Sequence, residues 1–353
     1  MFCVVALAAT GLTATATAAT AADPPRWGFA VIRIDGVPDS SRQGGSWPGG
    51  YRVQTTLGGP GQVFVRFPQI GRASGGVAHV TAISSSADWC QVEGWWQSGA
   101  DEVVAVQCHR YGVGPIASWF SLSFGDSSQY LPMPRAFGYV HWDGSAVVSR
   151  FNSSGPAAVN TVEPTSLPGV WWAVLPGFGS EVHAGNIQVT AVDPSVPARC
   201  KVAGWQPTPP AQRIVVRCYD ATGAPLSTGW SLTYHRERPV VGPSESNRFA
   251  YTFHIAPGTS VSPMTMAHLN YNSRGGTVQI SGSPDGPKKQ VVFTEVGAPP
   301  DNVQVTAVGY NAEFCNLSAP WDWYTTRVMI RHVVCYNGNW KVDHSAMITY
   351  AAR

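Results

Sequence analysis

Residues 186–191 read Asn-Ile-Gln-Val-Thr-Ala, and two other parts of the chain repeat this stretch closely. Residues 77–82 read Val-Ala-His-Val-Thr-Ala, and residues 302–307 read Asn-Val-Gln-Val-Thr-Ala. In each case a cysteine follows, then a tryptophan, and then a Val-rich segment that ends at a second cysteine. A recurring set of this kind is the sequence signature of an internal repeat, and its period here is about 110 residues.

Short segments within each repeat alternate apolar and polar residues, and they are rich in Val, Thr and aromatic side chains. Gly, Pro and Ser separate these segments, which is typical of antiparallel strands joined by turns. A unit of about 110 residues exceeds the roughly 20 to 50 residues of a solenoid or propeller repeat and can bury its own core. We therefore predict an all-β fold of three tandem antiparallel β-sandwich-like modules, at 23–131, 132–243 and 244–353.

The cysteines follow the same period. Beyond residue 22 they form three pairs with separations of 18, 18 and 20 residues: Cys90 with Cys108, Cys200 with Cys218, and Cys315 with Cys335. An even count at a recurring spacing predicts one disulfide within each module. A zinc site would need closely spaced Cys or His ligands, which the sequence lacks, so we predict no metal and no cofactor.

The N-terminal segment predicts export. Residues 1–22 are uncharged and contain an apolar run from Phe2 to Leu12, followed by an Ala/Thr tract. This pattern indicates a signal peptide cleaved after Ala21 or Ala22, and hence a secreted, extracellular protein. No Lys or Arg precedes the run, so either the true start lies upstream or the segment stays attached. The run is too short to cross a bilayer, and we expect no membrane insertion.

The composition excludes several classes of function. Charged residues make up 12% of the chain, against about 25% in ordinary soluble domains. A net charge of +2 supplies no broad basic field, so we expect no nucleic-acid partner. The sequence contains no nucleophile elbow, phosphate-binding loop, dinucleotide fingerprint or zinc-protease motif. No residue is therefore predicted to be catalytic.

The motif set resembles tandem disulfide-bonded β-repeat modules in secreted proteins of high-GC bacteria. The Gln-Val-Thr-Ala strand, the Cys followed by a Trp, the Val-rich strand and the segment Asn152-Ser153-Ser154-Gly155 carry the resemblance. The first copy departs from the pattern, since it has Ser46-Trp47-Pro48-Gly49-Gly50 in place of the Asn-Ser segment. The resemblance implies the fold, and no settled activity is attached to it.

Tryptophan doublets give the clearest functional signal. Successive strand residues point to opposite faces, so Trp95-Trp96 and Trp171-Trp172 each direct one ring away from the core. The repeat predicts that Trp95 and Trp171 face inward, which leaves Trp96 and Trp172 outward. Outward aromatic rings on a sandwich mark a contact surface and can stack on sugars. The alternative is that they pack against the neighbouring module.

Alignment of the three copies extends this outward set. Phe64 and Phe293 fall in the slot of Trp172, and we expect their side chains to face outward as well. Asp322 lies between Trp321 and Trp323, where an acid flanked by aromatic rings could contact sugar hydroxyls, although a turn role is the alternative.

The histidines show no ligand spacing, and His79 takes the strand position that Gln188 and Gln304 hold in the other copies. We therefore interpret His79 as an outward polar residue.

These features lead to one main hypothesis and two alternatives. We expect a secreted, non-catalytic, multivalent protein that binds carbohydrate or a cell-surface polymer through Phe64, Trp96, Trp172, Phe293, Trp323 and Asp322. An extracellular polysaccharide hydrolase or lyase is the second hypothesis, and it needs two carboxylates within reach of one bond. A structural wall or surface component is the third. The sequence does not specify the oligomeric state.

Overall fold

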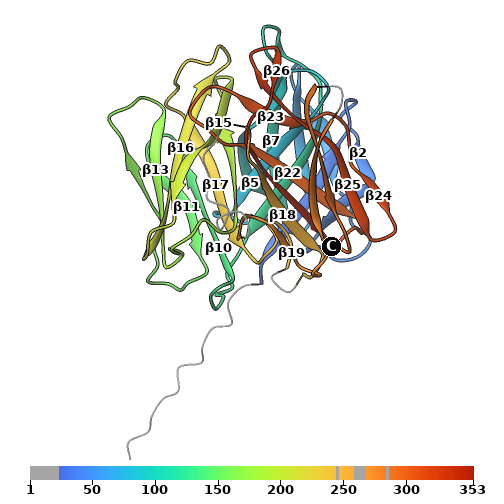
Figure 1. Ribbon diagram of the computed structural model, residues 1–353. Coiled ribbons are helices and arrows are strands. Elements are labelled where there is room, and N and C mark those ends of the chain that lie inside the picture. The colour runs from blue at the N-terminus through green and yellow to red at the C-terminus, as the bar shows by residue number, and fades with distance from the viewer. Residues whose placement is uncertain (1–23, 244–245, 258–267, 284–285) are drawn as a thin grey trace, which may run out of the picture.

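The computed structural model describes residues 24–243, 246–257, 268–283 and 286–353 (Figure 1). These residues form an all-β fold of strands joined by turns and loops. The expected signal peptide, residues 1–22, lies outside the described residues. Over the ranges given above, no helix has the length and apolar character needed to cross a membrane.

The strands occur in three consecutive stretches of the chain. The first stretch contains β1 (Arg26–Ile32), β2 (Pro38–Gly45), β3 (Gln54–Leu57), β4 (Gln62–Phe67), β5 (Val77–Ile83), β6 (Asp88–Ser98), β7 (Asp101–Arg110), β8 (Gly114–Pro115) and β9 (Trp119–Asp126). The second contains β10 (Ala136–Trp142), β11 (Val147–Asn152), β12 (Thr161–Pro164), β13 (Val170–Pro176), β14 (Asn186–Val192), β15 (Ala198–Gln206), β16 (Ala211–Asp220) and β17 (Gly229–Arg236). The third contains β18 (Phe249–His254), β19 (Tyr271–Asn272), β20 (Val278–Ser283), β21 (Gly286–Phe293), β22 (Asp301–Ala307), β23 (Phe314–Leu317), β24 (Asp322–Tyr324), β25 (Arg327–Asn337), β26 (Trp340–Val342) and β27 (Ala346–Ala352).

The same antiparallel pairings recur in every stretch. The first strand pairs with the last, and the last pairs with the Val-Thr-Ala strand, giving the orders β1–β9–β5, β10–β17–β14 and β18–β27–β22. The two cysteine-bearing strands also pair, as β6–β7, β15–β16 and β23–β25. Strand β4 shows why these segments form strands with one face in the core: buried Val63, Val65 and Phe67 alternate with half-buried Phe64 and Arg66.

The three predicted disulfides are confirmed. Cys90–Cys108, Cys200–Cys218 and Cys315–Cys335 each join two residues directly opposite on paired strands, with Cα–Cα distances of 4.0, 4.1 and 4.0 Å. Each bond closes a loop whose strands are already paired. In the chain-entropy model a disulfide that closes a loop of this length contributes on the order of 3 kcal/mol to stability.

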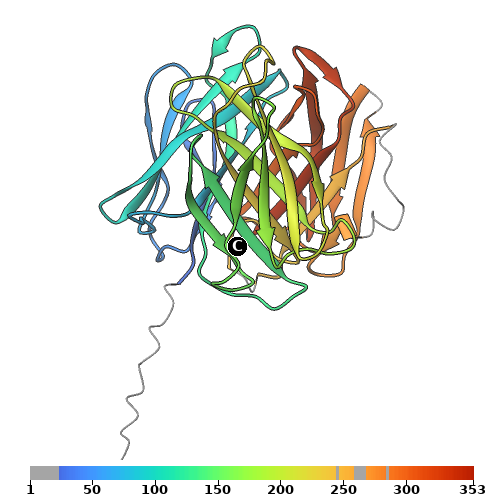
Figure 2. The ribbon, with the colours of Figure 1, turned by 90° about the vertical axis from the view of Figure 1, so that its left-hand side faces the viewer.

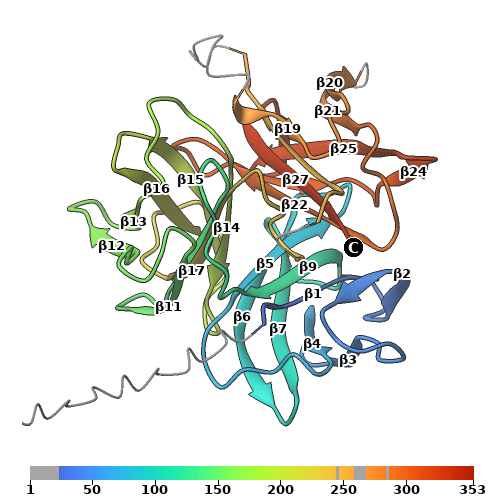
Figure 3. The ribbon, with the colours of Figure 1, turned by 90° about the horizontal axis from the view of Figure 1, so that it is seen from below.

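Hydrogen bonding between strands continues from each stretch into the next. Parallel pairs link Val192 to Val92, Leu317 to Ile83, and Val202 to Val308. Each stretch therefore contacts both of the others, and the three contacts close into a ring. Figure 3 shows the three stretches arranged around a common centre, where β5, β14 and β22 lie, and Figure 2 shows the second stretch, in green to yellow, between the other two.

Polar side chains of the three Val-Thr-Ala strands meet at this centre. Thr81 Oγ1 donates to Gln304 Oε1 at 2.8 Å, and Thr306 Oγ1 donates to Gln188 Oε1 at 2.9 Å. His79 Nδ1 and Thr190 Oγ1 lie 3.2 Å apart and complete the set. We call these hydrogen-bonded residues the central ring: Thr81, Thr190, Thr306, His79, Gln188 and Gln304.

The expected outward position of His79 is wrong, because its side chain is only 3% exposed. In an isolated sandwich this face of β5 would meet water, but here the second stretch covers it. Burial, together with the nearby His235, lowers the pKa of His79 to about 3. Gln188 and Gln304 are buried in the same way.

This burial predicts a pH dependence of stability that is specific to His79. The pKa of His79 is lower in the folded state than in the unfolded state. Its contribution to the free energy of unfolding is therefore fully present above about pH 6.5 and is lost as the pH falls, because the unfolded state then binds a proton that the folded state does not. Between pH 7 and pH 5 we expect the free energy of unfolding to fall by about 2 kcal/mol through this residue. The His79→Gln variant, which places the residue of the other two copies in this slot, should remove that part of the fall in urea titrations. An equal fall in both proteins would contradict the assignment.

Candidate functional site

Two expected outward aromatic residues lie together on the first stretch. The side chain of Trp96 is 46% exposed, and its ring meets that of Phe64 edge to face, with centroids 6.1 Å apart. Strand β7 lies between β4 and β6, and its Val103 and Ala105 are opposite Trp96 and Phe64. These two small residues are buried, so the two aromatic rings form the outermost layer here.

Polar side chains border this pair. Arg66 Nη1 lies 3.1 Å from Asp101 Oδ2 and 3.3 Å from Ser98 Oγ. Phe64, Trp96, Arg66 and Asp101 together are called the first aromatic face below. It combines the flat apolar area of two rings with a hydrogen-bond donor, Arg66, and a hydrogen-bond acceptor, Asp101.

A matching arrangement occurs on the second stretch. Trp172 of β13 is half-buried and lies opposite Glu163 on one side and Val215 on the other. The Arg213 guanidinium carbon lies 5.3 Å from the Trp172 ring centroid, and Arg213 Nη2 contacts Glu163 Oε2 at 2.7 Å. Trp172, Arg213 and Glu163 are called the second aromatic face.

Strand register shows that the two faces occupy equivalent positions. In the first stretch Gly94, Ala105 and Phe64 are neighbours across β6, β7 and β4. In the second stretch the row is Gly204, Val215 and Trp172, across β15, β16 and β13. Both rows begin beside a register shift, between Val92 and Gly94 and between Val202 and Gly204. The alignment of Phe64 with Trp172 therefore agrees with the structure.

The expected outward direction of Phe293 is wrong. Its side chain is 0% exposed and lies in the core with Val291 and Trp321. Its contacts match those of buried Phe67: each lies four residues before a glycine, Gly71 or Gly297, whose N–H donates to the carbonyl of the residue just before the second cysteine-bearing strand. Lys289 pairs with the residue two before the second cysteine, as Trp171 does, so the slot of Trp172 falls on half-buried Gln290. The third stretch thus lacks an aromatic residue at this position.

Trp323 and Asp322 have separate roles. The indoles of Trp321 and Trp323 both donate to the carboxylate of Asp301, the former at 2.9 Å. Burial raises the pKa of Asp301 to about 7, although these hydrogen bonds oppose the shift. Arg42 covers the Trp323 ring, with its guanidinium carbon 4.3 Å from the centroid. Asp322 forms an ion pair with Arg331, and as successive residues of β24 Asp322 and Trp323 point to opposite faces.

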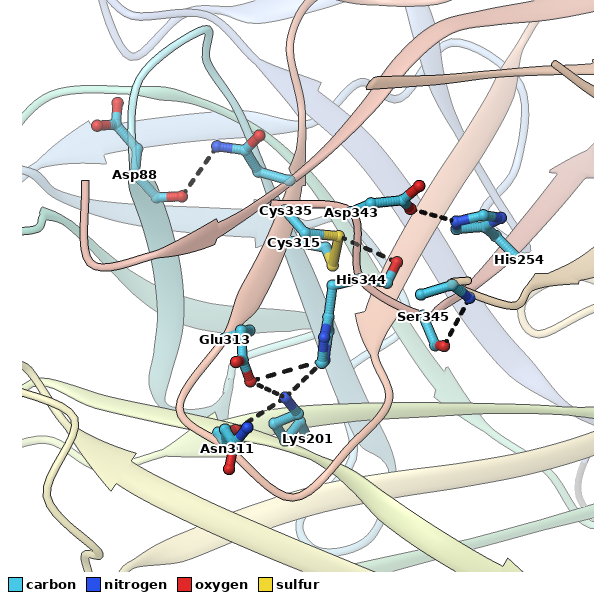
Figure 4. Close-up of a disulfide and its surroundings, with 12 residues drawn as sticks. Asp88, Lys201, His254, Asn311, Glu313, Cys315, Cys335, Asp343, His344 and Ser345 are labelled. Carbon is cyan, nitrogen blue, oxygen red and sulfur yellow. Dashed lines mark hydrogen bonds and ion pairs between the residues drawn. A yellow bond between two sulfur atoms is a disulfide. The ribbon is translucent and has the colours of Figure 1, made fainter. Parts of the chain in front are cut away.

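A group of ionisable side chains lies near the third disulfide, as Figure 4 shows. Lys201 of β15 reaches into the third stretch, where its Nζ lies 2.9 Å from His344 Nε2 and 3.5 Å from Glu313 Oε2. A second pair, His254 and Asp343, lies nearby at 2.8 Å, and Lys289 contacts the same carboxylate at 2.7 Å. Across the described ranges, no cluster of three or more His, Cys, Asp or Glu side chains could hold a metal ion.

The carboxyls with raised pKa values are poor candidates for acid catalysis. Burial raises the pKa of Glu102 to about 7, as it does for Asp301. Glu102 accepts a hydrogen bond from the backbone N–H of Arg72 at 2.9 Å. Both carboxyls are almost wholly buried, Glu102 at 1% exposed and Asp301 at 0%, and they lie in different stretches. A substrate could not place its reacting bond within hydrogen-bonding distance of either carboxyl.

Sequence reasoning missed two buried cations, Arg199 and Lys201, which flank Cys200. The repeat alignment contained the signal. The residues before the first cysteine of the other copies are Trp89 and Phe314, so an arginine in that slot departs from an aromatic position. Because the alignment compared motifs rather than the neighbours of each cysteine, it did not single out this difference.

Comparisons with protein-family models, with curated proteins and with solved structures find no match to this chain.

The exposure of the aromatic residues predicts that two substitutions lower stability by very different amounts. Phe293→Ala should lower the free energy of unfolding by about 3–5 kcal/mol, because it opens a cavity in the core. Trp96→Ala removes a ring that is 46% exposed and should cost less than about 1 kcal/mol. Equilibrium denaturation of the two variants measures both. Similar losses in the two variants would contradict the placement of Phe293 in the core.

Proposed function

We propose that this protein is a secreted, non-catalytic binding protein whose ligand is a carbohydrate or another cell-surface polymer. The observation that carries the proposal is the recurrence of one surface design. Two equivalent sheet positions, Phe64 and Trp172, each present an aromatic ring beside an arginine–carboxylate pair. A purely structural aromatic residue would not need this polar border.

The chemistry of both faces suits a sugar. An aromatic ring offers a flat apolar surface that stacks on the C–H side of a pyranose and loses little rotamer freedom on binding. A guanidinium donates hydrogen bonds to hydroxyl oxygens, and a carboxylate accepts from hydroxyl groups. Arg213 and Glu163 lie next to Trp172 and hold each other in place at 2.7 Å.

We further propose that the chain consists of three modules, at 23–131, 132–243 and 244–353. The strand pairings that recur within each stretch and the one disulfide in each stretch support this division. In this view the central ring joins the modules into one body, since its hydrogen bonds run between stretches. The two aromatic faces then keep a fixed separation and orientation.

A fixed arrangement of two faces favours a polymeric ligand. Strands β4 and β13 lie on different sides of the molecule in Figure 3, so a short oligosaccharide would meet one face at a time. A polymer network can meet both, and the second contact then gains from a high effective concentration. The valency supported by aromatic residues is two, because Gln290 takes the slot in the third stretch.

Export to the cell exterior belongs to the same proposal. Three disulfides are typical of proteins that fold in an oxidising compartment. The uncharged, partly apolar segment 1–22 has the composition of a signal peptide. A cell-surface polymer is accessible there.

The binding test uses single substitutions and a matched control. Trp172→Ala and Trp96→Ala should each weaken binding to the recognised polymer about tenfold, the equivalent of about 1.4 kcal/mol. Trp340→Ala is the control, since Trp340 is 81% exposed and lies outside both faces. Depletion assays with cellulose, chitin, xylan and peptidoglycan measure the affinity. Binding to none of them, or unchanged binding in both variants, would refute the carbohydrate proposal.

The double variant Trp96→Ala/Trp172→Ala tests the two-face arrangement. If both faces hold one polymer, removing both should lower the apparent affinity by more than the product of the single effects measured on a soluble oligosaccharide. Equal effects on the soluble oligosaccharide and the polymer would argue for a single face. A parallel assay for released reducing ends separates binding from cleavage.

A further inference from the structure

The residues that precede the first cysteine of each stretch meet at the centre of the molecule. Arg199 lies between two aromatic rings, with its guanidinium carbon 4.7 Å from the Trp89 centroid and 4.5 Å from the Phe314 centroid. Each of these three residues comes from a different stretch. The side chain of Arg199 is only 7% exposed.

A cavity of about 50 Å³ opens beside this arginine. We call it the central cavity. The Val-Thr-Ala segments of β5, β14 and β22 line it, together with the charged residues Arg199, Lys201 and Glu313. A water needs roughly 10–15 Å³ of such space, so the cavity has room for about four waters or for one small ion.

The charged groups that line the cavity do not balance. Lys201 and Glu313 face each other at 3.5 Å, and Lys201 Nζ also donates to the Asn311 carbonyl at 2.9 Å. Within the described ranges, Arg199 has no carboxylate among its hydrogen-bond partners. The carboxylate of Asp220 is nearby, but it accepts hydrogen bonds from the Thr222 hydroxyl and the Ala224 N–H. The cavity lining thus carries two cations and one anion.

The hydrogen-bond donors of Arg199 show the same imbalance. Nη2 donates to the Asp220 carbonyl at 3.1 Å, whereas Nε and Nη1 are buried and have no hydrogen-bond partner among the residues that the structure describes. The aromatic rings stabilise the cation through their faces, but the N–H groups lie in the guanidinium plane and need acceptors. Buried donors in native proteins nearly always have a partner, and an ion or water often supplies it.

We propose that the central cavity binds a small monovalent anion, such as a halide or a short carboxylate, on the free Nε–H and Nη1–H donors of Arg199. The anion would neutralise the excess cation and supply the two missing acceptors. Burial lowers the pKa of Arg199 only to about 10, so the guanidinium remains charged at neutral pH. The site joins all three stretches, because each contributes lining residues, and its occupation should stabilise the whole body.

Bromide is the direct probe of this site. Crystals of the full mature chain grown or soaked in sodium bromide, with data collected at the bromine absorption edge, should show an anomalous peak within hydrogen-bonding distance of Arg199 Nε or Nη1. Peaks confined to the protein surface, with only water beside Arg199, would overturn the proposal. This experiment needs no variant.

Thermal unfolding provides the solution test. At constant ionic strength, replacing sodium gluconate, a carboxylate too large for the cavity, with sodium bromide or sodium acetate should raise Tm. The rise should follow the logarithm of the anion concentration above the Kd and reach about 2–4 °C at ten times the Kd. The bromide and acetate arms distinguish a halide from a carboxylate.

Two matched variants complete the design. Arg199→Met keeps a long apolar side chain between Trp89 and Phe314 but removes the donors, so it should abolish the rise in Tm. Arg150→Met removes an exposed arginine of β11, outside the cavity and both aromatic faces, and should retain the rise. An equal rise in both variants would show a general salt effect and overturn the proposal. If Arg199→Met does not fold, the bromide peak decides the question.

Discussion

The threonine hydroxyls of the central ring are the constraint on which the rest of the structure depends. Each hydroxyl bonds a side chain of a neighbouring stretch and also accepts a backbone N–H from it: Thr190 from Val80, Thr306 from Val189, and Thr81 from Val305. A buried hydroxyl that loses such partners costs about 1–3 kcal/mol. Because each stretch relies on the next for these bonds, the polar strands β5, β14 and β22 can be buried only when all three are together.

The limits of sequence prediction follow from this arrangement. The strands, their turns and the three disulfides depend on local pattern, so the motif repeat was enough to predict them. His79 was misplaced because alternation along β5 shows which residues share a face, and it does not show what covers that face. Phe293 was misplaced because the motif alignment put it in the slot of Trp172, whereas its backbone contacts match those of the inward Phe67.

The candidate surface was predictable only in part. The doublet rule identified Trp96 and Trp172 from sequence, since opposite faces of a strand cannot share one core. The polar neighbours of Trp172 could not be found in this way, because Arg213 and Glu163 come from different strands and meet only through pairing. Trp323 shows a different case, because its indole, which was expected to bind carbohydrate, donates a hydrogen bond to the buried Asp301.

The single arginine between Trp89 and Phe314 has a consequence for symmetry. Three identical chains assembled around the same centre would place three copies of one residue there, and three guanidinium groups in a space of about 50 Å³ would repel one another strongly. A covalent chain escapes this restriction, since each copy can diverge by itself. Joining the repeats end to end therefore allows one polar, asymmetric feature to occupy a place that a true homotrimer would have to keep neutral.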